Sequence, residues 1–237
     1  DINSEGKLDS VAGVPPDYFS EDGQLWGNPL YNWDKMKADD FSWWKQRMAR
    51  QLSLYDLVRL DHFRGFEAFW KVPGSAKTAK EGQWVKAPGD ALFKAMHNEF
   101  PDLPVVAEDL GLITPEVDKL RKKHNLPGMK VLQFAFDGNE KNPHLPANYN
   151  NDCVAYTGTH DNNTSVAWYN ELNDKTKKYV QEKINFSEEK MPWPLIKTAL
   201  ASDAVLAIVP LQDIMALGAD DRMNIPGIAK GNWRWRF

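Results

Sequence analysis

The sequence predicts an α/β fold built on a parallel sheet, and two observations lead to this prediction. Short apolar runs alternate five times with segments of helical character, an order typical of right-handed βα units. Three of these apolar runs stop on a carboxylate, at Asp61, Glu108 and Asp161. Functional side chains gather at the C-terminal ends of parallel strands, so the three acids predict a catalytic cluster.

The N-terminal part is predicted as a loop followed by a helix. Residues 1–33 are rich in Gly, Pro, Asp and Asn without a sustained period. This predicts a long ordered loop, and such loops in compact domains are usually functional. Residues 39–54 are predicted as a helix capped by Asp39 or Asp40. Its apolar side chains at helical spacing are Phe41, Trp44, Met48 and Leu52.

From residue 55 onward the predicted strands and helices alternate. Strands are predicted at residues 55–60, 104–107, 129–136, 152–156 and 206–211. Helices are predicted at residues 90–100, 114–124 and, with a break near 191–194, 164–204. Thr114 and Pro115 suit the start of a helix, and residues 65–88 are predicted as loop. A complete (β/α)8 barrel has eight βα units over about 250 residues, so the five predicted strands account for only part of one.

The composition narrows the classes of function. The chain has 237 residues, a net charge of −4 and no long basic run, so we expect no nucleic-acid or membrane partner. It has no apolar stretch long enough for a membrane helix and no signal peptide, which favours a cytoplasmic location. The single cysteine, Cys153, excludes an internal disulfide. Ten Trp, seven Tyr and eleven Phe residues supply flat apolar faces that suit sugar rings.

Asp61 is the first candidate catalytic acid. Arg59 and Arg64 flank it in the sequence, and nearby positive charge favours the ionised form of a carboxylate. An ionised carboxylate at a strand end serves as a nucleophile or as a metal ligand. The alternative is a buried salt bridge that holds a loop, and spacing alone does not separate these interpretations.

Glu108 is the second candidate. It follows the apolar run 105–107, and a partly desolvated Glu at a strand end is suited to general acid catalysis. Its neighbour Asp109 competes for this role, but adjacent side chains of a strand point in opposite directions. We therefore favour Glu108, whose alternative role is that of a capping acid for the next element.

His160 and Asp161 follow the fourth predicted strand. A His beside an Asp is suited to bind a substrate hydroxyl or to form half of a metal site. A hydrolytic metal site needs several converging His and Asp ligands. The histidines His97, His124 and His144 fall on predicted helix or loop positions. We therefore expect no metal and no organic cofactor.

Motifs spread over the whole chain resemble one known family. They are Val11-Ala-Gly-Val-Pro-Pro-Asp-Tyr-Phe-Ser20, Gly23-Gln-Leu-Trp-Gly-Asn-Pro-Leu-Tyr31, Arg59-Leu-Asp-His-Phe-Arg-Gly65, Ala107-Glu-Asp-Leu-Gly111, Gly158-Thr-His-Asp-Asn162, Pro210-Leu-Gln-Asp213, Arg222-Met-Asn224 and Gly231-Asn-Trp-Arg-Trp235. Together they resemble the amylomaltases, which are 4-α-glucanotransferases, or disproportionating enzymes, of glycoside hydrolase family 77. The N-terminal motif is long and specific, whereas Arg-Leu-Asp and Thr-His-Asp are shared with the wider α-amylase clan.

The resemblance implies a TIM (β/α)8 barrel, of which this chain carries strands four to eight. It assigns Asp61 as the nucleophile on strand four and Glu108 as the general acid/base on strand five. Asp161 resembles the third carboxylate, on strand seven. The resemblance also implies a set of substrate-binding residues. These are Arg59, His160, Trp26, Tyr18, Asn28, Tyr31 and His62.

The implied organisation is a partial catalytic barrel over residues 1–237. Residues 1–33 would cover the active site, 55–213 would hold strands four to eight with their helices, and 214–237 would form a C-terminal segment. Members of the family are much longer than this chain. We therefore expect a piece of the enzyme that has little activity alone, with its N-terminal part absent or on a separate chain.

The expected function is transfer of α-1,4-glucan segments between maltooligosaccharides by a retaining double displacement. Two alternatives stay open. One is an α-glucan hydrolase of the amylase clan, and the other is a truncated glucan-binding piece without catalysis. The long motif over residues 11–31 favours the transferase over the hydrolase, and the retained acids argue against a non-catalytic piece.

Overall fold

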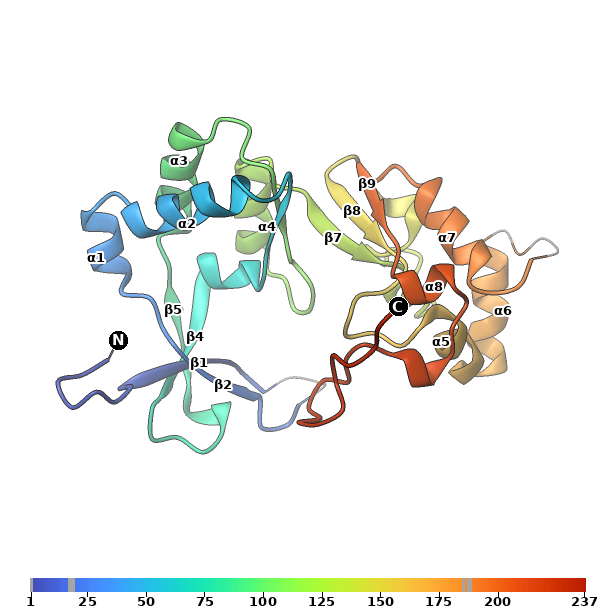
Figure 1. Cartoon of the computed structure of the whole chain (residues 1–237), viewed down its shortest axis with the longest axis horizontal. Helices are drawn as coiled ribbons and strands as arrows, with labels where there is room; N and C mark the ends of the chain where they lie inside the picture. The colour runs from blue at the N-terminus through green and yellow to red at the C-terminus, as the bar shows by residue number, and fades with distance from the viewer. Residues whose placement is uncertain (1, 17–19, 185, 187–188) are drawn as a thin grey trace. The chain divides into compact units, whose positions relative to one another are not determined.

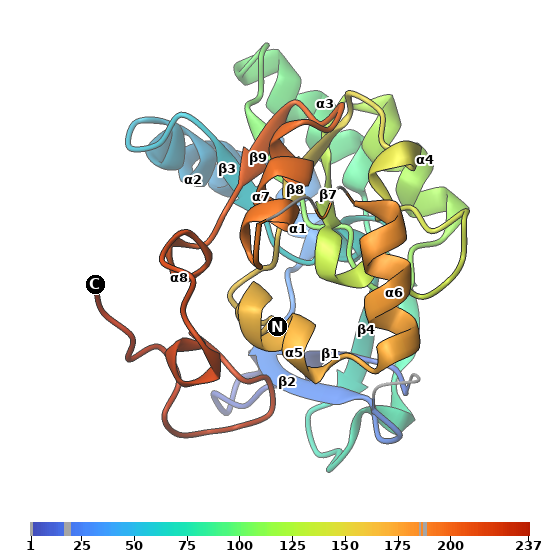
Figure 2. The same ribbon diagram turned by 90° about the vertical axis from the view of Figure 1, so that its right-hand side faces the viewer.

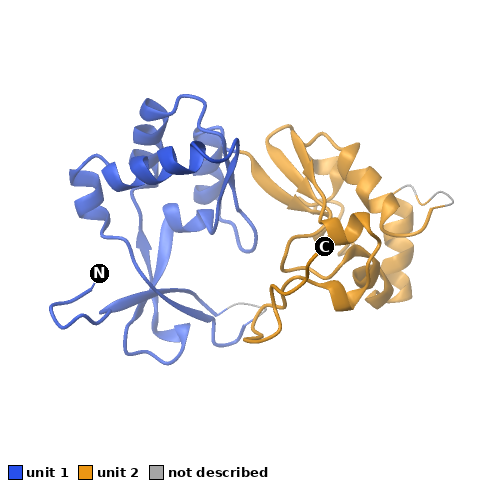
Figure 3. Cartoon of the chain, in the orientation of Figure 1, with its two compact units in different colours: residues 1–126 blue, residues 127–237 orange. Residues whose placement is uncertain are grey.

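The computed structural model places the chain in two compact units, each with its own parallel strands and core (Figure 3). The described residues are 2–16, 20–184, 186 and 189–237. The first unit spans Asp1–Leu126 and the second spans Pro127–Phe237. No helix in the described ranges combines the length and the apolar composition needed to cross a membrane.

An antiparallel sheet in the first unit corrects part of the sequence prediction. Its strands in sheet order are β2 (Gln24–Pro29), β1 (Ser10–Val14), β4 (Ala68–Pro73) and β5 (Gln83–Lys86) (Figure 1). The sequence predicts loops over residues 1–33 and 65–88, and the structure instead places two strands in each. β1 pairs along its length with β4, and pairing between such distant segments depends on tertiary contacts more than on local propensity.

The first unit also holds a parallel strand pair, β3 (Val58–Leu60) and β6 (Val105–Ala107). Leu60 pairs with Ala107 at the C-terminal ends of the two strands. Every residue of β6 is buried, as expected for a strand covered on both faces. The helices of this unit are α1 (Trp33–Ala38), α2 (Ser42–Leu52), α3 (Gly89–Glu99) and α4 (Pro115–Lys123).

Helix α2 follows the spacing of its apolar residues. Trp44 and Met48 lie one turn apart and are both buried. The N-cap position of α2 is Phe41, which makes no side-chain cap hydrogen bond. The Asp39 carboxylate, two residues earlier, accepts hydrogen bonds from the Ser42 N–H (3.3 Å) and the Ser42 hydroxyl (2.8 Å). The prediction that Asp39 or Asp40 caps this helix is therefore wrong, because α2 begins at Ser42, three residues after the predicted start. The largest fully buried side chains in the core of this unit are Phe63, Phe93, Leu92, Met96, Leu126, Val105 and Val117.

The second unit contains a parallel sheet in the order β7 (Gly128–Val131), β8 (Cys153–Tyr156) and β9 (Leu206–Ile208). The central strand β8 is buried throughout and contains Cys153, whose thiol donates to the Asn150 carbonyl (3.2 Å). The helices of this unit are α5 (Ser165–Glu171), α6 (Asp174–Lys183), α7 (Trp193–Leu200) and α8 (Leu211–Ile214). Helix α7 packs beside β8 and β9 (Figure 2).

The parallel strands that the sequence predicts all occur in the described residues, which confirms the α/β class. All five are shorter than predicted, and the largest differences are at β3, β7 and β9. β3 begins at Val58, three residues after the predicted start. β7 ends at Val131 because a 3-10 helix follows directly, and β9 ends at Ile208, shortly before Pro210, which lacks an N–H donor for the ladder. The 3-10 helices lie at Phe63–Phe66, Ala79–Glu81, Leu132–Phe134, Pro146–Asn148 and Ala219–Asp221. That these five strands are strands four to eight of a (β/α)8 barrel remains a prediction.

Candidate active site

Asp61 and Glu108 lie side by side at the ends of two paired strands. Leu60 of β3 pairs with Ala107 of β6, so the two acids occupy the next position of the same register. The ladder continues through this position, because the Glu108 N–H donates to the Leu60 carbonyl (2.9 Å) and the Phe63 N–H donates to the Glu108 carbonyl (3.0 Å). Neighbouring strands are about 4.8 Å apart, so the backbone alone holds the two acids close together.

The Glu108 carboxylate is partly buried and held at both oxygens. Oε2 accepts a hydrogen bond from the His62 N–H (2.7 Å), and Oε1 accepts one from the Leu110 N–H (2.9 Å). Burial raises the pKa of Glu108 above its ordinary value, against the effect of the two N–H donors, and the charge of Asp61 raises it further. A carboxyl group with a raised pKa holds a proton for donation to a leaving group.

The structure separates Glu108 from its competitor Asp109, as the alternation of a strand predicts. Asp109 forms an ion pair with Arg121 (3.3 Å), and the two side chains are only 8% and 6% exposed. Asp109 therefore stabilises the packing of α4 against the strand end. Glu108 is left to face the side of the unit that carries Asp61.

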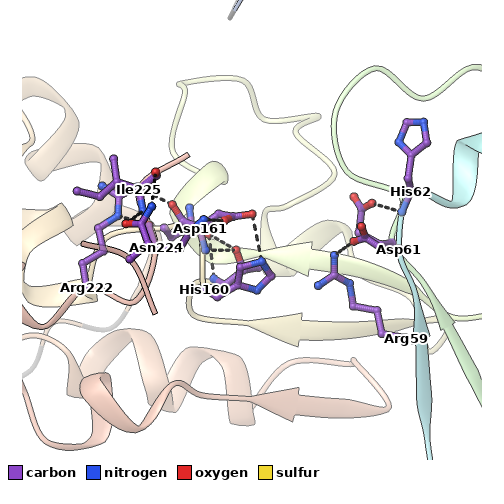
Figure 4. Close-up of polar contacts among 12 residues, drawn as sticks. Arg59, Asp61, His62, His160, Asp161, Arg222, Asn224 and Ile225 are labelled. Atoms are coloured by element: carbon purple, nitrogen blue, oxygen red, sulfur yellow. Dashed lines mark hydrogen bonds and ion pairs between the residues drawn. The ribbon is translucent and has the colours of Figure 1, made fainter. Parts of the chain in front are cut away.

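Asp61 forms an ion pair with Arg59 at the end of β3 (Figure 4). The Asp61 side chain is 79% exposed within the described chain, so the pair is not a buried salt bridge. Arg64, the other flanking arginine, donates instead to the Leu112 carbonyl (2.8 Å). Arg59 is therefore the positive group that directly contacts the Asp61 carboxylate.

His62 takes a left-handed backbone conformation, with φ of 49°, which directs its N–H to Glu108. Non-glycine residues adopt this conformation infrequently, and here the hydrogen bond to the carboxylate accompanies it. The ring packs edge-on against Trp26, with 4.7 Å between centroids. Burial lowers the pKa of His62, so the imidazole is neutral at neutral pH.

A cavity of about 580 Å³ in the first unit opens beside these residues, within the range of ligand sites. Predicted site residues in its wall are Trp26, Asn28, Tyr31, Arg59, Asp61 and His62. The wall also contains side chains that the sequence analysis did not assign to the site, including Trp44, Arg47 and Gln51 of α2. Arg47 donates to the Tyr31 hydroxyl (3.1 Å). The sequence signal that could have indicated Arg47 is its position three residues after Trp44, because residues at this spacing share one helix face.

In the second unit, Asp161 is held by the segment that follows 3-10 helix Ala219–Asp221. The Asn224 side-chain N–H donates to Asp161 Oδ1 (2.6 Å), and the Arg222 guanidinium donates to the Asp161 carbonyl (2.5 Å) (Figure 4). The sequence analysis noted the motif Arg222-Met-Asn224 without giving these residues a role. Their contact with Asp161 spans a long stretch of sequence, so spacing alone did not reveal it.

His160 lies next to Asp161 in both sequence and space. Its Nε2 is 3.3 Å from Asp161 Oδ2, and its ring packs against Trp233 at 5.1 Å between centroids. Trp233 has φ of +60°, a strained conformation for a bulky residue, and its side chain is largely exposed. Trp233 is therefore a further aromatic residue beside His160, and the sequence analysis did not assign it to the site.

The structure thus describes two groups of predicted residues, one in each unit. Asp61, Glu108 and the cavity residues belong to the first, and His160 and Asp161 belong to the second. Tyr18 lies outside the described residues. Among the described residues, no three His, Cys, Asp or Glu side chains gather in a way that could hold a metal ion.

A family model described as 4-alpha-glucanotransferase matches residues 4–237 of this chain. The chain is 52% identical to the 4-alpha-glucanotransferase of Thermus thermophilus, over 100% of this chain and 49% of that protein. It is 53% identical to the Synechocystis protein of the same name, over 98% and 46%. The chloroplastic/amyloplastic relative of Arabidopsis thaliana is 48% identical, over 100% and 41%. The chain therefore spans about half the length of the curated relatives it matches.

Two solved structures resemble the fold. The amylomaltase from Streptococcus agalactiae in complex with acarbose matches with a TM-score of 0.91 and 39% identity, over 99% of this chain and 48% of that chain. The amylomaltase from Corynebacterium glutamicum matches with a TM-score of 0.76 and 17% identity, over 95% and 38%. The second likeness, at such low identity, supports the fold alone.

Proposed function

Because the chain belongs to the 4-alpha-glucanotransferase family, we propose that the protein carrying it transfers α-1,4-glucan segments between maltooligosaccharides. The observation that carries the proposal is the shared register of Asp61 and Glu108 at the ends of β3 and β6. Retaining glycosidases use two carboxyl groups roughly 5–5.5 Å apart. Adjacent strands about 4.8 Å apart are suited to present such a pair.

Asp61 and Glu108 divide the work of a double displacement. Asp61 attacks the anomeric carbon while Glu108 donates a proton to the glycosidic oxygen, which breaks the bond and leaves a covalent glucosyl-enzyme. Glu108, now a carboxylate, takes a proton from the 4-hydroxyl of an acceptor glucan. That oxygen attacks the anomeric carbon and releases Asp61. The raised pKa of Glu108 supports the first of these steps.

The other predicted residues serve substrate binding in this proposal. Arg59 keeps the Asp61 carboxylate oriented through their ion pair. Asp161 and His160 hydrogen-bond sugar hydroxyls in the donor subsite, with Asp161 favouring the distorted, oxocarbenium-like state. Aromatic rings in the cavity wall of the first unit supply apolar faces for sugar rings. Four cavity-wall residues are assigned to substrate binding, namely Trp26, Tyr31, Asn28 and His62. Tyr18 is assigned to substrate binding as well.

Disproportionation of maltotriose, followed by chromatography of glucose and longer products, tests the transferase activity. We expect products both shorter and longer than the substrate from the protein that carries this chain, and their loss in the Asp61→Asn and Glu108→Gln variants. Shorter products alone would indicate a hydrolase. Calorimetric binding of maltooligosaccharides without any products would indicate a glucan-binding protein. A cytoplasmic location is part of this proposal, and cell fractionation tests it.

Trp26 is proposed to favour a sugar acceptor over water by limiting the access of solvent to the glucosyl-enzyme. Its ring lies in the cavity wall and contacts His62. The Trp26→Ala variant is expected to raise the ratio of hydrolysis to transfer. Trp193→Ala, which removes a similarly exposed tryptophan at the start of α7, is the matched control. An unchanged ratio in Trp26→Ala would contradict this role.

A further inference from the structure

Asp213 is a wholly buried carboxylate that the proposed mechanism does not use. It lies in the short helix α8, directly after β9, and is 1% exposed. Its Oδ2 accepts hydrogen bonds from the Thr157 hydroxyl (2.7 Å) and the Ser165 hydroxyl (2.6 Å), and its Oδ1 accepts one from the Ser165 N–H (2.7 Å). Three short bonds from neutral donors make Asp213 the centre of a buried polar network.

The partners of Asp213 bracket the segment that carries two candidate site residues. Thr157 directly follows β8, and Ser165 is the first residue of α5. Both partners are 0% exposed. The chain between them contains His160 and Asp161, so one carboxylate fixes both ends of the turn on which these residues lie. A further contact, from Gln133 Nε2 to the Asn163 carbonyl (2.9 Å), holds the same turn from the 3-10 helix Leu132–Phe134 that follows β7.

Gln212, the neighbour of Asp213, contacts the 3-10 helix Ala219–Asp221, and the segment that follows this helix binds Asp161. The Gln212 amide N–H donates to the Asp221 carbonyl (3.4 Å), and the Trp235 ring N–H donates to the Asp221 carboxylate (3.0 Å). The next residue, Arg222, donates to the Asp161 carbonyl. The dipeptide Gln212-Asp213 is thereby connected to both segments that contact Asp161, the turn that carries it and the segment that binds it.

We propose that Asp213 is a positioning residue for Asp161 and His160 rather than a group that touches substrate. This inference rests on the proposed function, because it assigns Asp213 to the same site. Weakening the network loosens the hold of Asp213 on the ends of the turn, while the contacts of Gln133, Arg222 and Asn224 remain. A displacement of about 1 Å at a reacting group lowers a rate roughly 100-fold, whereas substrate contacts made elsewhere are unaffected. The loss is therefore expected in kcat more than in KM.

Two variants and a matched control test the proposal. Asp213→Asn keeps the volume of the side chain but replaces one acceptor oxygen by a donor. Thr157→Val removes a single hydrogen bond and changes no charge, so it stays informative where Asp213→Asn does not fold. The control is Asn173→Ala, which removes the N-cap of α6 in the same unit. It lowers the stability of the helix without contact to this network.

The first readout does not depend on activity. The His160 ring lies against Trp233, so the indole ring current shifts its proton resonances, which are assigned by comparison with His160→Gln. We expect these resonances to move in Asp213→Asn and Thr157→Val but not in Asn173→Ala. Equal movement in the variants and the control, or none in any of them, would overturn the proposal.

The second readout is maltotriose disproportionation by the full-length protein that carries the chain. We expect kcat to fall roughly 10- to 100-fold in the Asp213 and Thr157 variants, with a smaller change in KM, and no such fall in the control. An unchanged kcat would overturn the positioning role. If the unaltered protein forms no transfer products, the proposed function fails, while the resonance shifts still decide whether Asp213 positions the turn.

Discussion

Replacing Glu108 by glutamine tests how the two strand ends are held. Both carboxylate oxygens accept a backbone N–H, from His62 at 2.7 Å and from Leu110 at 2.9 Å. A glutamine amide has one oxygen and one NH2 group, so one of these N–H groups faces a donor and loses its partner. An unsatisfied buried donor costs about 1–3 kcal/mol. We expect the free energy of unfolding to fall by that amount at neutral pH.

The stability difference between the wild type and Glu108→Gln has a definite dependence on pH. Burial raises the pKa of Glu108 in the folded chain above 4.5, so the folded chain binds this proton more tightly than the unfolded chain. The contribution of Glu108 to stability therefore falls as the pH rises from about 4.5 through the folded pKa. Glutamine does not titrate, so the advantage of the wild type over the variant grows as the pH is lowered toward 4.5.

Urea unfolding followed by circular dichroism, at neutral pH and near pH 4.5, measures this difference. Glu99→Gln, an exposed position at the end of α3, is the control and is expected to stay within about 0.5 kcal/mol of the wild type. The same Glu108 variant is expected to lose about 100- to 10,000-fold in transfer rate, the usual contribution of a general acid/base. A stability gap that shrinks toward acid pH would refute the reasoning about burial.

Three further predictions follow from contacts in the two units. Phe63 is 0% exposed, so Phe63→Ala is expected to lower the free energy of unfolding in urea by about 3–5 kcal/mol; a loss below about 1 kcal/mol would contradict its place in the core. A Cβ at Gly13 would lie 2.5 Å from the Gln24 carbonyl oxygen, so Gly13→Ala is expected to separate β1 from β2 and to speed amide exchange in β1, which unchanged exchange would contradict. Asn224→Ala removes the donor to Asp161 Oδ1. Because a hydrogen bond to a charged group contributes about 1.5–3 kcal/mol, we expect kcat/KM for maltotriose to fall roughly 10- to 100-fold. Unchanged kinetics would show that Asn224 is not part of the site.

Helix prediction succeeded where the signal was local. The spacing of Trp44 and Met48 placed α2, although neither predicted acid occupies its N-cap position, which is Phe41. Such periodicity reflects a helix that buries one face, which the sequence displays directly. The antiparallel sheet escaped prediction because its strands are short and three of them contain Gly or Pro. Its strands gain stability only by pairing with distant segments.

The site was predictable to the level of residue identity but not of contacts. The apolar runs before Asp61 and Glu108 marked these acids, and strand alternation separated Glu108 from Asp109. No spacing rule indicated that the His62 N–H would hold Glu108 or that Asn224 would hold Asp161. These bonds join residues far apart in the chain, so their formation depends on how the segments pack.

By itself the sequence determined the order of the parallel strands and helices and the acids that end three of the strand segments. Hydrophobic runs, helical spacing and residue type are local properties, so they can be read without coordinates. Only the tertiary structure decided that Asp61 and Glu108 share one register, that a cavity opens beside them, and that buried Asp213 ties the turn of Asp161 to α8. Each of these features arises from packing and hydrogen bonding between segments that are distant in the sequence. Burial of apolar side chains within each unit brings these segments into contact.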